Sequence, residues 1–334
     1  MFFSLIIPVF NRPEDMQEVL EGLSQQTYTN FEVIVVESGS EIKSDQVVAS
    51  FKDRLDIHYY LKGNDGQGFS RNYGLAKAKG DYLIILDSDI IIPSHYMQGV
   101  YDFLKHDYLD AFGGPDRGHA SFTAVQKAVD FALTSYLTTG GTRGRKKGAG
   151  TYYPRSFNMG MSREVYEKTK GYALPNCGED IELSIRIQKW GFKTGLIPDA
   201  YVYHKRKKTL GGFFKQMEWF GKSRINLYRI YPESLQLMHL LPLGFYFYVL
   251  LMIAMFIFLP VIGWLMLTTL ISYFIAVFVE ALIRYQSFKV ALYSICTSAS
   301  VFIGYGYGLV KYFFLQKTPY TNVPDISHLP NANI

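Results

Sequence analysis

The chain has 334 residues, of which 49% are hydrophobic and 16% aromatic, and its formal net charge is +5. This composition is too apolar for a disordered chain, and the length corresponds to roughly two domains. The only two cysteines, Cys177 and Cys296, argue against a disulfide framework or a zinc site built from several thiolates. Lysines and arginines adjoin apolar segments, so attraction to lipid or phosphate explains them better than nucleic acid does.

The first part of the chain alternates predicted strands and helices. The opening segment, MFFSLIIPVFNRP, is apolar for only a few residues and has no basic leader or cleavage site, so it predicts a first strand and not a signal peptide. A helix opens at Pro13, and further strands are predicted at 31–36 and 57–61. Helices are predicted near 44–52 and 69–79. This alternation indicates an α/β domain built from βαβ units.

Two aspartates lie inside the apolar segment LIILDSDIII at 83–92, which otherwise indicates a buried strand. A buried charge costs several kcal/mol unless it is paired, so Asp87 and Asp89 need a partner. In extended backbone both carboxylates point the same way, and oxygen ligands suit Mg²⁺ or Mn²⁺, which would in turn hold phosphates. The alternative is that Asp87 begins a turn and Asp89 caps the next element.

Polar groups follow each of the four predicted strands. In open α/β sheets, ligands bind beyond the carboxyl ends of the strands, so these groups are expected to meet at one edge. They are Asn11 and Arg12, Glu37 and Ser38, the glycine-rich loop 63–68, and the two aspartates.

Arg71 lies one turn into the helix after the glycine-rich loop. Backbone N–H groups at a helix start attract phosphate, and an arginine there would add a bidentate contact. A solvated surface arginine is the alternative. The glycine spacing matches neither a Walker loop nor a dinucleotide fingerprint.

The second part of the chain predicts a membrane region. No charged side chain occurs at 235–279 or at 290–310, which suits a hairpin turning near 260–263 and a third span. We expect a transmembrane region of about three helices at 235–316 and an irregular tail at 317–334. The third helix is expected to pack through its small residues. These are Ser300, Gly304 and Gly308.

Basic residues set the expected orientation. Eight lysines and arginines between 205 and 229 precede the first span, and Arg284 and Lys289 lie between the second and third. Because positive charge collects on the cytoplasmic side, residues 1–230 and 280–289 are predicted to be cytoplasmic, with three crossings and an outer C-terminus. An amphipathic helix at 209–232 is expected to lie in the membrane interface, with core packing as the competing interpretation.

Four segments in order resemble the successive blocks of family 2 glycosyltransferases of the GT-A fold, over about residues 1–230. They are SLIIPVFNRP, VIVVESGS, GFSRNYGLAKAKGDYLIILDSD and GEDIELSIRIQKWGFK. The resemblance implies a Rossmann-like, doubly wound mixed sheet in a catalytic domain at 1–208. It also implies inverting transfer from a nucleotide-diphosphate sugar, usually a UDP-sugar, to an acceptor. With the predicted spans and the positive charge beside them, we expect a lipid-linked or glycan acceptor at the cytoplasmic face of a membrane, the bacterial inner membrane.

The matching blocks also imply roles for single residues. Asp89 and His204 would bind Mn²⁺ or Mg²⁺, and Asp180 would be the catalytic base beside Glu179. Acids at a helix start are favoured by the macrodipole in any case, which is the alternative for this pair. Ser38 departs from the family pattern, which usually has a second acid there. The donor nucleotide would be lined by Pro8, Phe10, Asn11, Glu37, Ser38, Arg71 and Asp87.

A loop at 138–150 is rich in glycine and basic residues, cannot build a core and is predicted to be mobile. Its charge would meet the phosphate of a lipid-linked acceptor, or the loop is simply solvated. The basic residues are Arg143, Arg145, Lys146 and Lys147.

Two other functions compete with single sugar addition. Processive polysaccharide synthases carry a QxxRW motif, whereas here Gln216-Met217-Glu218-Trp219 lacks the arginine. A catalytically silent membrane scaffold that binds nucleotide sugars is the second rival, and the retained Asp87, Asp89, Asp180 and His204 argue against it.

Overall fold

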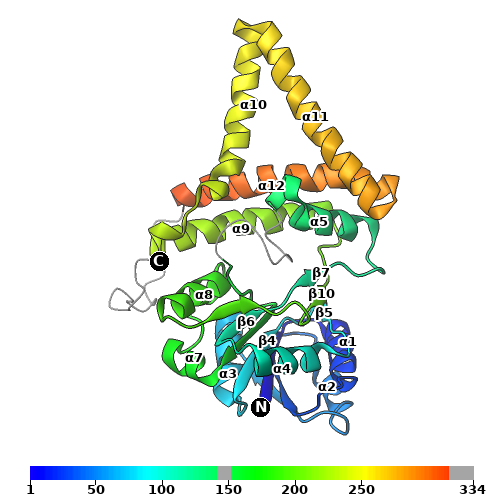
Figure 1. Ribbon diagram of the computed structural model, residues 1–334, viewed down its shortest axis with the longest axis vertical. Coiled ribbons are helices and arrows are strands. Elements are labelled where there is room, and N and C mark those ends of the chain that lie inside the picture. The colour runs from blue at the N-terminus through cyan, green and yellow to red at the C-terminus, as the bar shows by residue number, and fades with distance from the viewer. Residues whose placement is uncertain (141–151, 316–334) are drawn as a thin grey trace. The chain divides into compact units, whose positions relative to one another are not determined.

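The computed structural model describes residues 1–140 and 152–315, which form two compact units (Figure 1). Unit 1 contains the described residues 1–119 and 152–205, and unit 2 contains 120–140 and 206–315. The predicted catalytic domain runs without interruption over 1–208, whereas residues 120–140 belong to unit 2. The predicted tail at 317–334 lies outside the described residues.

Unit 1 is built on a seven-stranded sheet with strand order β3-β2-β1-β4-β8-β6-β9. The first four of these strands are parallel, and β8 runs antiparallel to both β4 and β6, so the predicted mixed sheet is confirmed. The strands are β1 (Phe3–Val9), β2 (Phe31–Ser38), β3 (Ile57–Lys62), β4 (Tyr82–Leu86), β6 (Ala111–Gly113), β8 (Asn158–Ser162) and β9 (Thr194–Leu196).

Helices cover both faces of this sheet. Successive side chains of a strand point to opposite faces. In β1, accordingly, Leu5 and Ile7 lie in one apolar cluster and Ile6 in the other. The first cluster includes residues of α1 (Pro13–Ser24), α2 (Asp45–Ala49) and α4 (Tyr96–His106), and the second includes residues of α3 (Gln67–Lys77), α7 (Arg163–Thr169) and α8 (Glu179–Lys189). The doubly wound architecture is therefore confirmed.

A second, three-stranded sheet of unit 1 has the order β5-β10-β7. It consists of β5 (Ile90–Ile91), β10 (Val202–His204) and β7 (Asp116–Arg117). The prediction of one continuous strand over 83–92 was wrong, because β4 ends at Leu86 and the chain enters a different sheet at Ile90. Asp87 and Asp89 lie in the break, where the Asp87 amide donates to the Phe157 carbonyl at 3.2 Å and the Lys205 amide donates to the Asp89 carbonyl at 2.9 Å.

Unit 2 is helical in its described residues. It contains α5 (Ala124–Thr134), α6 (Tyr136–Thr139), α9 (Leu210–Ile230), α10 (Leu241–Phe258), α11 (Pro260–Tyr285) and α12 (Phe288–Leu315), with short 3₁₀ turns at Pro232–Ser234 and Leu237–Leu240. Helices α10 and α11 reverse direction at Leu259, next to the predicted turn. Among the described residues, three helices are long and apolar enough to cross a membrane, as predicted: 237–258, 260–285 and 288–315.

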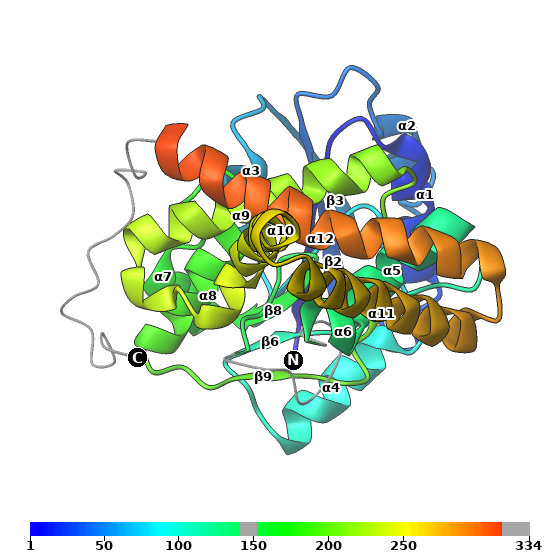
Figure 2. The same ribbon diagram turned by 90° about the horizontal axis from the view of Figure 1, so that it is seen from above.

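Helices α9 and α12 lie side by side, as both views show (Figures 1 and 2). Glycines allow their backbones to approach, because a Cβ on Gly221 would lie 2.3 Å from the Tyr305 carbonyl oxygen and one on Gly308 would lie 2.2 Å from that of Glu218. Gly304 faces Met217 in the same way. The predicted packing of the third apolar helix is confirmed for Gly304 and Gly308, and its partner is α9. The Ser300 hydroxyl donates to the Cys296 carbonyl of its own helix at 2.8 Å.

A buried carboxylate links α5 to α11 within unit 2. Asp130 is 4% exposed and accepts hydrogen bonds from Arg206 at 2.7 Å and from the Tyr285 hydroxyl at 2.9 Å. Arg284 lies 3.6 Å from the same carboxylate. The pairing compensates the cost of burying this charge and joins α5 to other parts of unit 2.

Candidate active site

Three of the predicted metal and donor residues meet at the carboxyl end of β4. One ligand atom each from Asp87, Asp89 and His204 lies within 4.8 Å of the others. Antiparallel pairing of β10 with β5 sets His204 opposite Ile90, and the His204 ring nitrogen Nε2 lies 3.1 Å from Asp89 Oδ1. Two carboxylates and an imidazole that converge in this way fit a divalent cation.

Charges around Asp89 are balanced without a metal. Burial raises the pKa of Asp89, but the nearby His204 and the ion pair with Arg12 outweigh it and hold that pKa well below its usual range. Burial lowers the pKa of His204, and the Asp89 carboxylate outweighs this, so the pKa of His204 is raised. A cation entering this site would therefore compete with the proton on His204.

Two further residues lie next to His204. The Phe157 ring stacks on the imidazole with ring centroids 5.1 Å apart. On the other side, His204 Nδ1 lies 3.9 Å from Asp116 Oδ2, which belongs to β7 of the same small sheet. At this distance Asp116 forms no hydrogen bond with Nδ1, and the Nε2 atom of His204 is the one that faces the cluster.

Arg71 connects the metal cluster to the start of α8. Arg71 is 2% exposed, and its guanidinium forms ion pairs of 2.9 Å with both Asp87 and Glu179. Arg71 is thus not a solvated surface arginine. The first amides of α3 are also occupied, because the Gly68 amide donates to the Pro175 carbonyl at 2.8 Å and the Gln67 amide to the Asn176 side chain at 3.0 Å.

The predicted catalytic pair, Glu179 and Asp180, opens α8 at the residue expected from the sequence. The residue before it, Gly178, has φ +99°, a conformation that residues with side chains rarely adopt. Burial, and then the neighbouring Asp180 carboxylate, raises the pKa of Glu179. Asp180 is more open and lies 3.3 Å from Arg155. The pair therefore has two different environments, one buried and one facing an exposed arginine.

The parallel strands bring the other predicted donor residues to the same edge, as expected. Phe10 is 49% exposed after β1, and Pro8 pairs with Val36 of β2. The backbone amide of Asn11 donates to Ser40 Oγ at 2.8 Å, and Ser40 in turn donates to Glu37. Asn11 and Glu37 are therefore coupled through one serine.

The Glu37 and Ser38 side chains form hydrogen bonds with other residues of the protein. Glu37 is fully buried and accepts from the Ser44 amide at 2.9 Å and from the Tyr59 hydroxyl at 3.3 Å. The Ser38 hydroxyl donates to Ser70 at 2.6 Å. In this structure both residues hold the segments that border the edge of the sheet.

Sequence reasoning assigned no role to four residues of the site. Arg12 was noted only as polar, and Asp116, Phe157 and Arg155 were not singled out. Their roles depend on strands and loops far apart in the chain, so no local pattern marks them; the single signal is an acid, Asp116, directly after the sequence Gly-Gly-Pro. The predicted acceptor residues Arg143, Arg145, Lys146 and Lys147 lie outside the described residues.

Similarities to known proteins agree with this geometry. The sequence model of a family described as glycosyl transferase family 2 matches residues 4–170. An uncharacterized glycosyltransferase of Rickettsia typhi (strain ATCC VR-144 / Wilmington) is 41% identical over 86 residues, which are 26% of this chain and 26% of the relative. A poly-beta-1,6-N-acetyl-D-glucosamine synthase of Staphylococcus epidermidis is 24% identical over 218 residues, which are 64% of this chain and 52% of the relative.

These matches thus span about a quarter and about half of the relatives' own lengths. Among solved structures, the mannosyltransferase PcManGT of Pyrobaculum calidifontis, in complex with GDP-Man and Mn²⁺, has a TM-score of 0.60 at 15% identity. The similarity covers 94% of this chain and 88% of that one. At this level of identity it shows the fold.

Proposed function

Because the chain belongs to glycosyl transferase family 2, we propose that it transfers a sugar from a nucleotide-diphosphate donor to a lipid-linked or glycan acceptor at the cytoplasmic face of a membrane. The observation that carries the proposal is the meeting of Asp87, Asp89 and His204 within 4.8 Å at the carboxyl end of the sheet. The three long apolar helices and the basic residues that precede them support the membrane location.

Asp89 and His204, with Asp87, would hold Mn²⁺ or Mg²⁺. When bound, such an ion offsets the negative charge that develops on the departing diphosphate. Arg71 fixes the orientation of the Asp87 carboxylate, because the same guanidinium is anchored by Glu179 on α8. The donor side of the site is thereby held rigid before substrate arrives.

Asp180 is proposed to act on the acceptor. The acceptor oxygen forms a bond to the anomeric carbon, the bond from that carbon to the diphosphate oxygen breaks, and the hydroxyl proton passes to the Asp180 carboxylate. Attack from the side opposite the leaving group inverts the anomeric centre. Arg155, whose guanidinium lies 3.3 Å from the Asp180 carboxylate, borders the side from which the acceptor would approach in this proposal.

The proposed donor is a UDP-sugar, on the resemblance of the sequence blocks. A nucleotide-release assay with detergent-purified protein, Mn²⁺ and a panel of UDP-, GDP- and dTDP-sugars tests this. Release should occur with one class of donor and fall by about 10² or more in Asp89→Asn. The matched control is Asp53→Asn, an exposed acid of unit 1, which should keep normal release. A panel without any release would support the silent scaffold instead.

A polymer synthase is the second candidate, and the similarity to the Staphylococcus epidermidis synthase over 64% of this chain favours it. The two functions differ in the length of the product. Mass spectrometry of the acceptor after donor exhaustion should show one added sugar for single transfer. A ladder of additions on the same acceptor would establish processive synthesis.

A further inference from the structure

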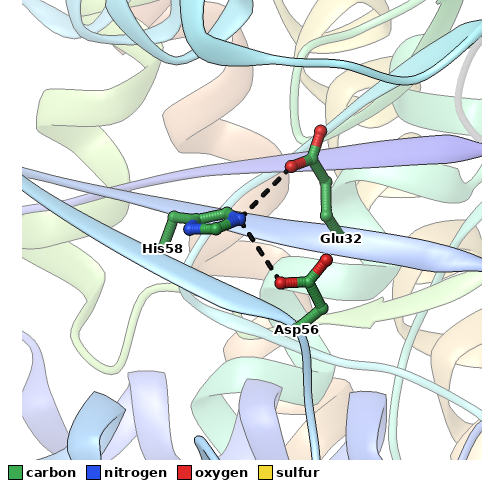
Figure 3. Close-up of side chains that lie close together, drawn as sticks. All are labelled: Glu32, Asp56 and His58. Atoms are coloured by element: carbon green, nitrogen blue, oxygen red, sulfur yellow. Dashed lines mark ion pairs between the residues drawn. The ribbon is translucent and has the colours of Figure 1, made fainter.

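The side chains of Glu32, Asp56 and His58 lie close together (Figure 3). Glu32 lies near the start of β2, His58 lies on β3, and Asp56 directly precedes β3. Because Val33 pairs with Ile57 in parallel register, Glu32 lies opposite Asp56, and His58, two residues on, points to the same side. The cluster thus adjoins the amino ends of these strands, whereas Asp87 follows a carboxyl end.

The Glu32 carboxylate is fully buried but only half satisfied. Its Oε1 accepts from the Ser4 hydroxyl at 2.6 Å and from the Lys79 amide at 2.7 Å. Its Oε2 is buried, has no hydrogen-bond partner and points at His58 Nε2, 3.5 Å away (Figure 3). The His58 Nε2 atom is likewise buried without a hydrogen bond. Two ligand atoms that form no hydrogen bond therefore face one another.

Placing the carboxylates of Glu32 and Asp56 close together without a bound cation is energetically unfavourable. Like charges directly opposite on neighbouring strands repel, and a buried oxygen without a partner bears the full cost of desolvation. In the described part of the chain, neither Glu32 nor Asp56 forms an ion pair with a lysine or arginine. A cation between the two carboxylates would remove both costs.

The distances fit a tetrahedral ion. His58 Nε2 lies 3.3 Å from Asp56 Oδ1 and 3.5 Å from Glu32 Oε2. Ligands about 2.0–2.1 Å from a tetrahedral zinc ion are about 3.4 Å from one another. In such a site the metal ion lies along the lone pair of Nε2, and the two carboxylate oxygens lie to either side of that direction. They are therefore poorly placed to accept a hydrogen bond from an Nε2–H group. The absence of a hydrogen bond at Nε2 agrees with this.

We propose that Glu32, Asp56 and His58 bind Zn²⁺ and so join the edge strand β3 to β2. One imidazole with two carboxylates is a ligand set that zinc accepts, and exposed Asp56 leaves a fourth position open to water. Magnesium prefers a near-octahedral shell of oxygen ligands, which the diphosphate of the donor would help to complete at Asp89 and His204 but which these three residues alone do not supply. The proposal does not depend on the proposed glycosyl transfer, because none of the three residues belongs to that site.

Zinc content tests the proposal directly. Full-length protein in detergent, stripped with a chelator, is equilibrated with micromolar Zn²⁺, desalted and measured by elemental analysis. Because the cluster of Asp89 and His204 also binds divalent ions in our proposal, the measurement is made in the Asp89→Asn background. One equivalent of zinc should remain there, and His58→Gln should remove it.

Two more variants make the test specific. Asp56→Asn alters an exposed side chain, so the protein should fold, yet its zinc affinity should fall at least tenfold in a competition titration with a chromophoric chelator. His106→Gln changes an exposed histidine on α4 and should retain the zinc. Zinc should also raise the thermal midpoint of the Asp89→Asn protein, and Mg²⁺ at the same concentration should not.

One outcome would show that a proton on His58, and not zinc, bridges the two carboxylates. If His58 only bridges the carboxylates as an imidazolium, His58→Gln would lower the thermal midpoint without zinc, and all variants would have the same zinc content. That result, or equal zinc affinity in Asp56→Asn and His106→Gln, would overturn the proposal. Unchanged nucleotide release in Asp56→Asn would show that the zinc site and the transferase site are separate.

Discussion

His204 Nε2 lies 3.1 Å from Asp89 Oδ1, although 115 positions separate the two residues in the chain. The contact exists because β10 pairs antiparallel with β5, which sets His204 opposite Ile90, the residue after Asp89. Two residues from distant blocks thereby become one site. The raised pKa of His204 and the lowered pKa of Asp89 both arise from this pairing, which outweighs the opposing effect of burial.

The pair predicts a specific dependence of stability on pH. Because the pKa of His204 is raised in the folded protein, the ion pair contributes stability fully below about pH 6.5, the ordinary histidine value, and loses it as pH rises through the folded-state pKa. The metal-free wild type should therefore lose thermal stability above pH 6.5 more steeply than His204→Gln. Differential scanning fluorimetry measures this, and parallel curves for the two proteins would contradict it.

Metal affinity should increase with pH over the same range in which the stability of the metal-free protein decreases. A cation needs neutral imidazole as a ligand, so the apparent affinity for Mn²⁺ should rise as His204 loses its proton. Isothermal titration at pH 6 and pH 8 measures the effect. The rise should be smaller in His204→Gln, which has no proton to lose at this position.

Asp180→Asn separates the proposed base from a structural acid. The amide keeps the shape of the side chain but cannot accept the proton, so the transfer rate should fall by about 10² to 10⁴. Donor affinity should remain within a few-fold, because the donor is held by other residues. An Asp180→Asn enzyme with near-normal turnover would exclude Asp180 as the base.

Asp89→Ala is the complementary variant. It should lose both donor binding and transfer, because the charge on the departing diphosphate is then uncompensated. Titration of the nucleotide sugar and single-turnover rates on both variants separate the two steps. Equal donor affinity in Asp89→Ala and Asp180→Asn would argue against the assignment of Asp89 to the metal.

Arg71→Ala should destabilise unit 1 strongly. The substitution leaves Asp87 and Glu179 without the guanidinium that pairs with both, and breaking a buried ion pair by removing one partner costs about 3–5 kcal/mol. Arg54→Ala, which breaks an exposed pair with Glu21, should cost at most about 1 kcal/mol.

Tryptophan fluorescence can follow this unfolding in unit 1 alone. The chain has three tryptophans, so a background with Trp219→Phe and Trp264→Phe leaves Trp190, which follows α8, as the reporter. Urea midpoints of the Arg71 and Arg54 variants are then compared in this background. Similar midpoints would show that the buried pairs contribute no more than surface ones.

Gly308→Leu should loosen unit 2. A side chain at Gly308 would meet the Glu218 carbonyl oxygen at 2.2 Å, so the helices α9 and α12 must separate, at a cost of about 1–3 kcal/mol. Gly244→Leu on α10 is the matched control, because nothing lies within 4 Å of a Cβ there. Thermal unfolding in detergent should be lowered by the first substitution only. Equal midpoints would mean that the close α9–α12 contact is dispensable.

The same contact predicts two membrane crossings where the sequence predicted three. Helix α9 carries several charged residues, and one of them, Glu218, pairs with Lys311 of α12 at 2.7 Å. A helix with this charge lies at the membrane interface and not in hydrocarbon, so α12 alongside it should lie there too. The hairpin of α10 and α11 would then be the part that spans.

Cysteine labelling decides between the two topologies. In a background with Cys177→Ala and Cys296→Ala, a cysteine at Val261 near the hairpin turn should react with an impermeant maleimide from outside. A cysteine at Leu315, the last residue of α12, should react only after the membrane is opened. Reaction at both positions from outside would establish three crossings.

Much of this protein can be predicted from local sequence. The start of α8 and the hairpin turn agree with the structure, because helix starts and prolines act on nearby backbone. The mixed sheet, which the family resemblance implied, agrees as well. The gathering of polar residues at one edge of the sheet can be predicted as well, because parallel strands end on the same side. Ordered sequence blocks were enough to indicate the family before any contact was known.

Only the tertiary structure decided which charges meet. Segments far apart in the chain meet in the double ion pair of Arg71, in the contact of Asp116 with His204 and in the cluster of Glu32, Asp56 and His58. The break between β4 and β5 likewise depends on two different sheets. Periodicity records which face of an element is buried, but not which distant element buries it. Which charged side chains pair with one another depends on how the whole sheet and its helices pack. The ion pairs of both candidate sites are therefore set only when the strands are paired.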